Sequence, residues 1–336
     1  MNMCVKLIYL ICMVSLFACK PSGGAPSGEA KEKVTASVPA APVFNADSAY
    51  MYVDKQVKFG PRVPNTPAHQ ACGDYLASEL RRFGAKVYEQ EAVLTAYDKT
   101  ALKARNIIGS YNPENDRRIL LFAHWDSRPY SDHDPDPANH RKPLDGADDG
   151  ASGVGVLLEI ARQLGMKNPG AGVDIIFFDA EDYGTPEFAE DYTPDTWCLG
   201  SQFWAKNPHV SGYRADFGIL LDMVGAKNAT FFKERLSVSK AGNVVEKVWN
   251  TARDLGYGKY FIHANGIAVT DDHEYVMKGR NIPCIDIINN DPDKSDHGFG
   301  WYWHTQQDNM DNIDRETLEA VGRTVLEVVY NHDNRK

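Results

Sequence analysis

Carboxylate and imidazole side chains recur in this sequence just beyond the apolar runs that predict buried strands, and just before one predicted helix. These residues are His124 and Asp126, Asp149, Glu181 and Asp182, Asp222, and His304. One carboxylate at a strand end is more often a turn former or a helix cap, but several together repel one another unless a cation compensates their charge. Imidazoles and carboxylates without a CxxC or CxxH spacing suit a catalytic Zn²⁺ that keeps an open coordination position.

Four short apolar runs predict the strands that would position this chemistry. Residues 118–123, 173–178, 217–221 and 284–288 are nearly continuous in apolar side chains. Such runs are typical of strands buried on both faces in a mostly parallel sheet. Ligands of parallel sheets bind beyond the carboxyl ends of the strands, which is where the acidic and imidazole residues fall.

Helix signals alternate with these runs. Thr66 and Pro67 predict the start of a helix that Gly84 ends, and Asp314 predicts the cap of the last helix. Between the first two strands, residues 152–164 carry apolar side chains at i, i+3, i+4 and i+7. This order predicts an α/β fold, a single three-layer α/β/α domain with a mostly parallel, twisted central sheet, which we place at residues 44–336.

The N-terminus predicts export. Lys6 precedes an apolar run from Leu7 to Ala18, which is shorter than the about 20 residues that span a bilayer. It suits a secretory signal peptide over residues 1–18. Cys19 directly after it resembles the lipidated cysteine of bacterial lipoproteins, and an ordinary cleaved signal is the alternative. Residues 19–43 then predict the lipidated Cys19 and a flexible linker rich in Pro, Ser, Gly and Ala.

Composition, net charge and the number of cysteines exclude further classes of protein. The 336 residues are 43% hydrophobic and carry a formal net charge of −10, which indicates a folded protein and argues against a nucleic-acid partner. Without the signal peptide and Cys19 the free cysteines are Cys72, Cys198 and Cys284, too few for a disulfide framework. We expect a monomer in the bacterial cell envelope, periplasm-facing and in contact with the membrane only through its lipid anchor.

Five motifs follow one another along the chain: His124-x-Asp126, the glycine-rich stretch 146–153, Glu181-Asp182, Leu221-Asp222-Met223 and His304-Thr305. This is the order found in the M28 zinc-aminopeptidase superfamily, which the sequence resembles. Within that superfamily, Asp271-Asp272-His273 and Trp303-His304-Thr305 are similar to the glutaminyl cyclases (glutaminyl-peptide cyclotransferases). The resemblance implies an M28 aminopeptidase-like fold.

The resemblance also implies roles for individual residues. Asp149, Asp182 and His304 would bind one Zn²⁺, although Asp182 stands where many family members have Glu. Glu181 would be the proton shuttle, and a hydrogen bond between the Asp222 and Asp271 carboxyl groups would hold the scissile amide nitrogen. Trp303 would line the substrate pocket. The stretch 183–197 departs from the family pattern; because it is rich in acidic, aromatic and Pro residues, we interpret it as a lid over the site, with Trp197 in the pocket.

Alternatives accompany these roles. A helix N-cap is the alternative for Asp271, core packing for Trp303 and a solvated loop for the lid. Asp126 and His273 are expected to orient the ligands. A second metal, held by His124 and Asp222 with Asp149 bridging, is not excluded.

The activity implied by the resemblance is a transferase reaction that converts N-terminal Gln of peptides and proteins to pyroglutamate with release of ammonia. The runner-up is an M28-type aminopeptidase with two zinc ions that releases N-terminal residues. A non-catalytic binding domain on the same scaffold is a third hypothesis, which the complete set of motif positions disfavours.

Overall fold

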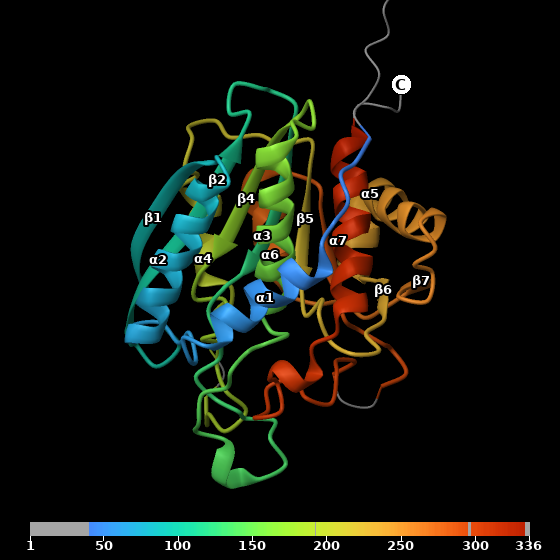
Figure 1. Cartoon of the computed structure of the whole chain (residues 1–336). Helices are drawn as coiled ribbons and strands as arrows, with labels where there is room; N and C mark the ends of the chain where they lie inside the picture. The colour runs from blue at the N-terminus through green and yellow to red at the C-terminus, as the bar shows by residue number, and fades with distance from the viewer. Residues whose placement is uncertain (1–39, 192, 295–296, 333–336) are drawn as a thin grey trace, which may run out of the picture. The chain divides into compact units, whose positions relative to one another are not determined.

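A central twisted sheet organises the molecule. The computed structural model describes residues 40–191, 193–294 and 297–332 (Figure 1). Among these residues, six strands pair in the order β1-β2-β4-β3-β5-β8, with β4, β3, β5 and β8 parallel and β1 and β2 antiparallel at one edge. Their bounds are β1 Lys86–Thr95, β2 Ala101–Tyr111, β3 Arg118–His124, β4 Gly172–Phe178, β5 Phe217–Asp222 and β8 Cys284–Ile288.

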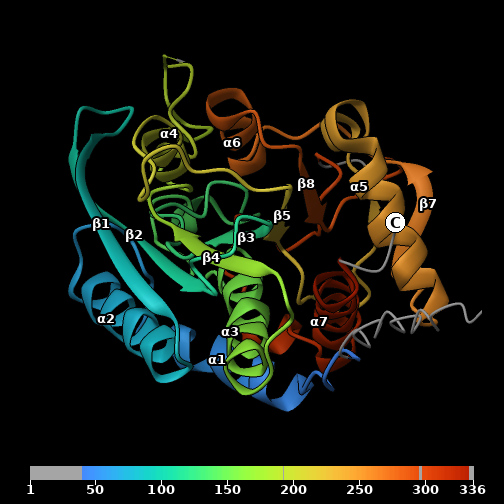
Figure 2. The ribbon, with the colours of Figure 1, turned by 90° about the horizontal axis from the view of Figure 1, so that it is seen from above.

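Helices cover both faces of the sheet, which gives the three layers seen in Figure 2. One face carries α1 (Ala46–Val57), α2 (Pro67–Arg82), α3 (Ala151–Met166) and α7 (Arg315–Tyr330). The other face carries α4 (Leu199–Lys206) and α6 (Asp272–Arg280). Beyond β8 lie α5 (Arg235–Asp254) and a small parallel pair, β6 (Phe231–Lys233) and β7 (Phe261–Asn265). Short 3-10 turns occur at η1 (Pro137–Asn139) and η2 (Met310–Asn312).

The predicted elements are confirmed. The four apolar runs form the parallel strands β3, β4, β5 and β8, whose side chains are buried along their whole length. Thr66 caps α2 by accepting a hydrogen bond from the His69 amide at 3.2 Å, and Asp314 caps α7. The N-terminal predictions, including the signal peptide and Cys19, lie outside the described residues, and the boundary at residue 43 stays a prediction.

The antiparallel strands β1 and β2 were not predicted from the sequence. β1 is an edge strand with polar side chains at alternating, partly exposed positions, so it lacks the continuous apolar run of the inner strands. Pairing with β4 extends the sheet and buries the second half of β2.

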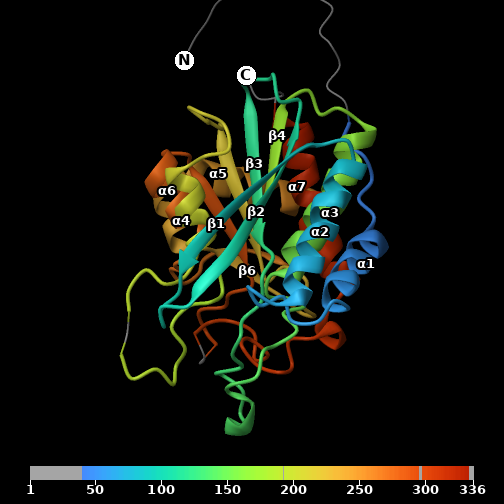
Figure 3. The same cartoon turned by 90° about the vertical axis from the view of Figure 1, so that its left-hand side faces the viewer.

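The carboxyl ends of the parallel strands lie together at one end of the sheet, where the long loops gather (Figure 3). These loops follow β3, β4 and β8 and hold most of the predicted site residues. In the described part of the chain, no helix combines the length and the apolar character needed to cross a membrane.

Gly153 sets how closely α3 packs on the sheet. A methyl group at this position would overlap the carbonyl oxygen of Leu221 in β5. Gly153→Ala is therefore expected to destabilise the protein by about 1–3 kcal/mol, because the helix must move away from the strand. The measurement is the free energy of unfolding in urea. Gly242→Ala in α5 is the control: no neighbouring atom lies within 4 Å of the added methyl, so no loss is expected. Equal stability of both variants would contradict this packing argument.

Candidate active site

Three predicted metal ligands converge at the end of the sheet where the carboxyl ends of the parallel strands and the long loops lie. Asp149 precedes α3, Asp182 follows β4, and His304 lies in the loop after β8; one ligand atom from each lies within 4.8 Å of the other two. His304 Nε2 is 3.4 Å from Asp182 Oδ1 and 3.6 Å from Asp149 Oδ2. All three side chains are buried.

The chemistry of this cluster fits a zinc ion. Both carboxylate oxygens of Asp182 are buried and have no hydrogen-bond partner among the described residues. Burial and the charge of Asp149 raise the pKa of Asp182 well above its usual range, so a cation is needed to keep these carboxylates ionised together. Burial, followed by the charge of Arg128, lowers the pKa of His304 well below its usual range. A neutral imidazole is the form that binds a metal.

Two buried aspartates hold the backbone on which the ligands stand. Asp308 accepts hydrogen bonds from the amides of Asp148 and Asp149 at 2.8 and 3.1 Å. Asp126 accepts from the amides of Glu181 and Asp182 at 3.0 and 3.2 Å. The position of Asp126 agrees with the orienting role expected for it, and Asp308 holds the backbone of Asp149 in the same way.

His124 forms a second cluster beside the first. Its Nε2 atom lies 3.0 Å from Asp149 Oδ1 and 3.2 Å from Asp222 Oδ1. Burial alone would lower the pKa of His124, but Asp126, Asp149 and Asp222 together raise it well above its usual range. One ligand atom each from His124, Asp149 and Asp222 lie within 4.8 Å of one another. This geometry suits either a charged imidazole between carboxylates or a second metal.

Glu181 lies next to the ligand Asp182 and is only 9% exposed. The Cys198 thiol donates a hydrogen bond to Glu181 Oε1 at 3.1 Å, and Asp271 completes a compact group with these two. Burial raises the pKa of Glu181 well above its usual range; His124 opposes this rise and Asp271 adds to it. A carboxyl group whose pKa is raised in this way is suited to both accepting and returning a proton.

Asp222 and Asp271 line the same pocket as Glu181. Burial raises the pKa of both carboxyl groups, and the charge of Asp222 raises that of Asp271 further. In the structure Asp222 pairs with His124, and Asp271 accepts a hydrogen bond from the Asp272 amide as the N-cap of α6. Asp271 is thus an N-cap that also lines the pocket, and the direct bond between the two carboxyl groups stays a prediction.

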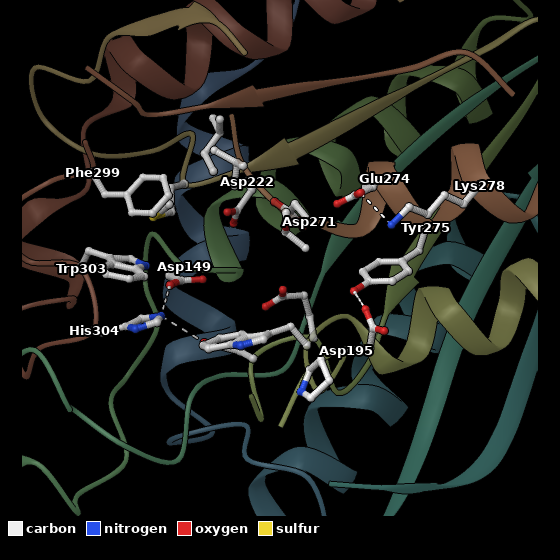
Figure 4. Close-up of a pocket in the computed structure, with 18 residues that line it drawn as sticks. Asp149, Asp195, Asp222, Asp271, Glu274, Tyr275, Lys278, Phe299, Trp303 and His304 are labelled. Atoms are coloured by element: carbon white, nitrogen blue, oxygen red, sulfur yellow. Dashed lines mark hydrogen bonds and ion pairs between the residues drawn. The ribbon is translucent and has the colours of Figure 1, made fainter. Parts of the chain in front are cut away.

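Two tryptophans flank His304 in the pocket. The Trp303 ring stacks on the imidazole with centroids 3.8 Å apart, and the Trp197 ring lies parallel to it at 5.9 Å. Figure 4 shows Trp303 beside His304 and Asp149. The cavity that these residues line has a volume of about 370 Å³. Both tryptophans line this cavity, so Trp303 is not the simple core residue of the alternative interpretation.

Two further residues belong to the site although sequence reasoning assigned them no role. Arg128 is fully buried, donates to the Asp182 carbonyl at 3.0 Å and places its guanidinium 4.5 Å from the Trp197 ring centroid. Its only sequence signal is its place two residues after Asp126. Cys198 contacts Glu181, as described above. The His273 imidazole pairs with Glu234 at 3.3 Å, and the orienting role expected for it stays a prediction.

A family model and solved structures show which family the chain belongs to. The chain matches the model of peptidase family M28 over residues 106–329 and belongs to that family. It is similar to a Zn-dependent exopeptidase from Parabacteroides distasonis, with 75% identity and a TM-score of 0.86 over 87% of this chain and 100% of that chain.

Within the family, the chain belongs with the bacterial glutaminyl cyclases. Tannerella forsythia glutaminyl cyclase is 70% identical, with a TM-score of 0.85 over 86% of this chain and 99% of that chain. Glutaminyl-peptide cyclotransferase from Bos taurus is 28% identical over 297 residues, which cover 80% of this chain and 77% of that protein. The family resemblance read from the five motifs is confirmed.

Proposed function

We propose that this protein is a zinc-dependent glutaminyl-peptide cyclotransferase that converts the N-terminal Gln of peptides and proteins to pyroglutamate and releases ammonia. The convergence of Asp149, Asp182 and His304 next to Glu181, in one pocket, carries this proposal. The similarity to bovine and bacterial glutaminyl cyclases supports it.

The reaction forms a bond from the substrate's α-nitrogen to its own γ-carbon and breaks the bond from that carbon to the amide nitrogen. Asp149, Asp182 and His304 would hold the Zn²⁺, which would supply Lewis-acid polarisation of the γ-carbonyl group. Glu181 accepts a proton from the α-amine and returns one to the departing nitrogen. Asp222 and Asp271 accept hydrogen bonds from that nitrogen, and the two tryptophans flank the glutamine side chain and exclude water.

The test is a reaction with a peptide that begins with Gln. Ammonia release, with a peptide product lighter by one ammonia molecule, is the expected result. Release of free Gln with a shortened peptide would instead identify an aminopeptidase and overturn the proposal.

The His124 cluster is the observation that favours the aminopeptidase alternative, since its atoms suit a second metal. We propose one zinc ion, with His124 held as a charged partner of Asp149 and Asp222. Elemental analysis of the purified protein distinguishes the two: one zinc per chain supports the cyclase, and two support the alternative.

We also propose that the protein is an exported lipoprotein anchored in the cell envelope through Cys19, and that it is monomeric. Cys19→Ser removes the thiol to be acylated, so the variant is expected in the soluble fraction after cell lysis, whereas the parent protein sediments with membranes. Cys72→Ser, a substitution of a buried core cysteine, is the control that keeps the anchor. Membrane sedimentation of both variants would argue against lipidation at Cys19.

A further inference from the structure

One face of α6 continues the catalytic pocket toward solvent. Asp271, Glu274, Tyr275 and Lys278 are spaced i, i+3, i+4 and i+7, so they form one stripe along the helix, and all four line the pocket. Exposure rises along the stripe: Asp271 is 4% exposed, the Glu274 side chain 20% and the Lys278 side chain 61%. Seven residues of helix span about 10 Å, the length of roughly three extended peptide residues.

The outer half of this stripe is charged and organised. Lys278 Nζ pairs with Glu274 Oε1 at 2.7 Å, and the Tyr275 hydroxyl donates to Asp195 Oδ1 at 3.1 Å (Figure 4). The second bond ties α6 to the loop that also carries Trp197. The metal cluster and the proposed proton transfer do not involve Asp195, Glu274, Tyr275 or Lys278, yet all four line the same pocket.

We infer that this surface is the subsite for the residues that follow the N-terminal Gln, and that it favours a cationic side chain at the first of them. This inference rests on the proposed function. A glutamine side chain held at the metal cluster directs the rest of the peptide outward, and α6 provides a wall of matching length. We call the surface formed by Asp195, Glu274, Tyr275 and Lys278 the outer subsite.

The charge of the outer subsite decides its preference. Asp195 and Glu274 contribute two carboxylates against the one ammonium of Lys278, and the deeper wall adds the carboxyl group of Asp271. A guanidinium or ammonium on the substrate can replace Lys278 as the partner of Glu274 and pair with Asp195. An acidic side chain would meet two like charges and only one opposite one. Pairs of this kind at a solvent-exposed rim change affinity modestly and are sensitive to salt.

The experiment compares kcat/KM for three tetrapeptide amides, Gln-Arg-Ala-Ala, Gln-Ala-Ala-Ala and Gln-Glu-Ala-Ala, by ammonia release from the zinc-loaded enzyme. At low salt we expect the order Arg, Ala, Glu, with each step about two- to fivefold. At about 1 M salt, where the Debye length is about 3 Å, the differences should largely vanish.

Variants that each remove one charged group locate the effect. The quantity compared is the ratio of kcat/KM for the Arg peptide to kcat/KM for the Glu peptide. Asp195→Asn and Glu274→Gln are each expected to lower this ratio at least about twofold, and Lys278→Gln to raise it by a similar factor. Asp254→Asn, at an exposed carboxylate at the end of α5, changes the net charge in the same sense and by the same amount as the two carboxylate variants and should leave the ratio unaltered.

The outcomes separate the two proposals. Three results would overturn the outer subsite alone: equal rates of cyclisation for all three peptides, a preference for the Glu peptide, or an Arg-to-Glu ratio of kcat/KM that is the same in the parent protein and the three variants. Absence of ammonia from every peptide would overturn the proposed function, and the subsite with it.

Discussion

Glu181→Gln is expected to lower kcat by about 10²–10⁴-fold while the protein still binds its zinc. Glutamine keeps the shape of the side chain and can still accept the hydrogen bond from the Cys198 thiol. It cannot take up a proton, so the transfer from the α-amine to the departing nitrogen loses its carrier. The substitution adjoins the ligand Asp182 without removing any ligand atom.

Two measurements on this variant are needed together. Ammonia release gives kcat and KM, and elemental analysis after dialysis gives the zinc content. Glu190→Gln is the matched control, because Glu190 lies in the same loop and is exposed. Turnover of Glu181→Gln at the parent rate would refute the shuttle assignment, and loss of its zinc would mean that the effect is structural.

His304→Ala is expected to lose the metal, and with it all measurable cyclisation. The variant leaves Asp149 and Asp182 facing each other, and burial with mutual repulsion already raises the pKa of Asp182. Removal of residues that only orient ligands weakens metal binding by 10–100-fold, so removal of a ligand should weaken it by more than about 10²-fold.

Zinc content after dialysis and the thermal midpoint with and without added zinc measure this effect. The parent protein should gain stability from zinc because only the folded state presents the three ligands. His304→Ala should not respond to zinc at the same concentration. His263→Ala, which removes an exposed imidazole on β7, is the control expected to keep both metal and response. Full zinc occupancy in His304→Ala would show that the ligand set was assigned wrongly.

Local patterns explain why the sequence predicted so much of the fold. The inner strands carry continuous apolar runs, and the helix caps at Thr66 and Asp314 lie within a few residues of the hydrogen bonds they make. The edge strand β1 escaped prediction because one side of its environment is solvent, which permits polar side chains. The ligands were assigned through the family resemblance of the motifs that contain them, because position after a strand does not single them out: His304 lies far beyond the end of β8.

The sequence alone determined the parallel strands, the order of the five motifs and the family that they indicate. Only the tertiary structure decided which atoms meet: Asp308 supports the amide of Asp148 from 160 positions away, and His124 reaches Asp222 from 98. It also buried Arg128 under Trp197 and turned one face of α6 into the pocket wall. The reason is physical. Periodicity and capping depend on neighbours along the chain, whereas contacts between distant loops depend on how the packed layers bring strand ends together.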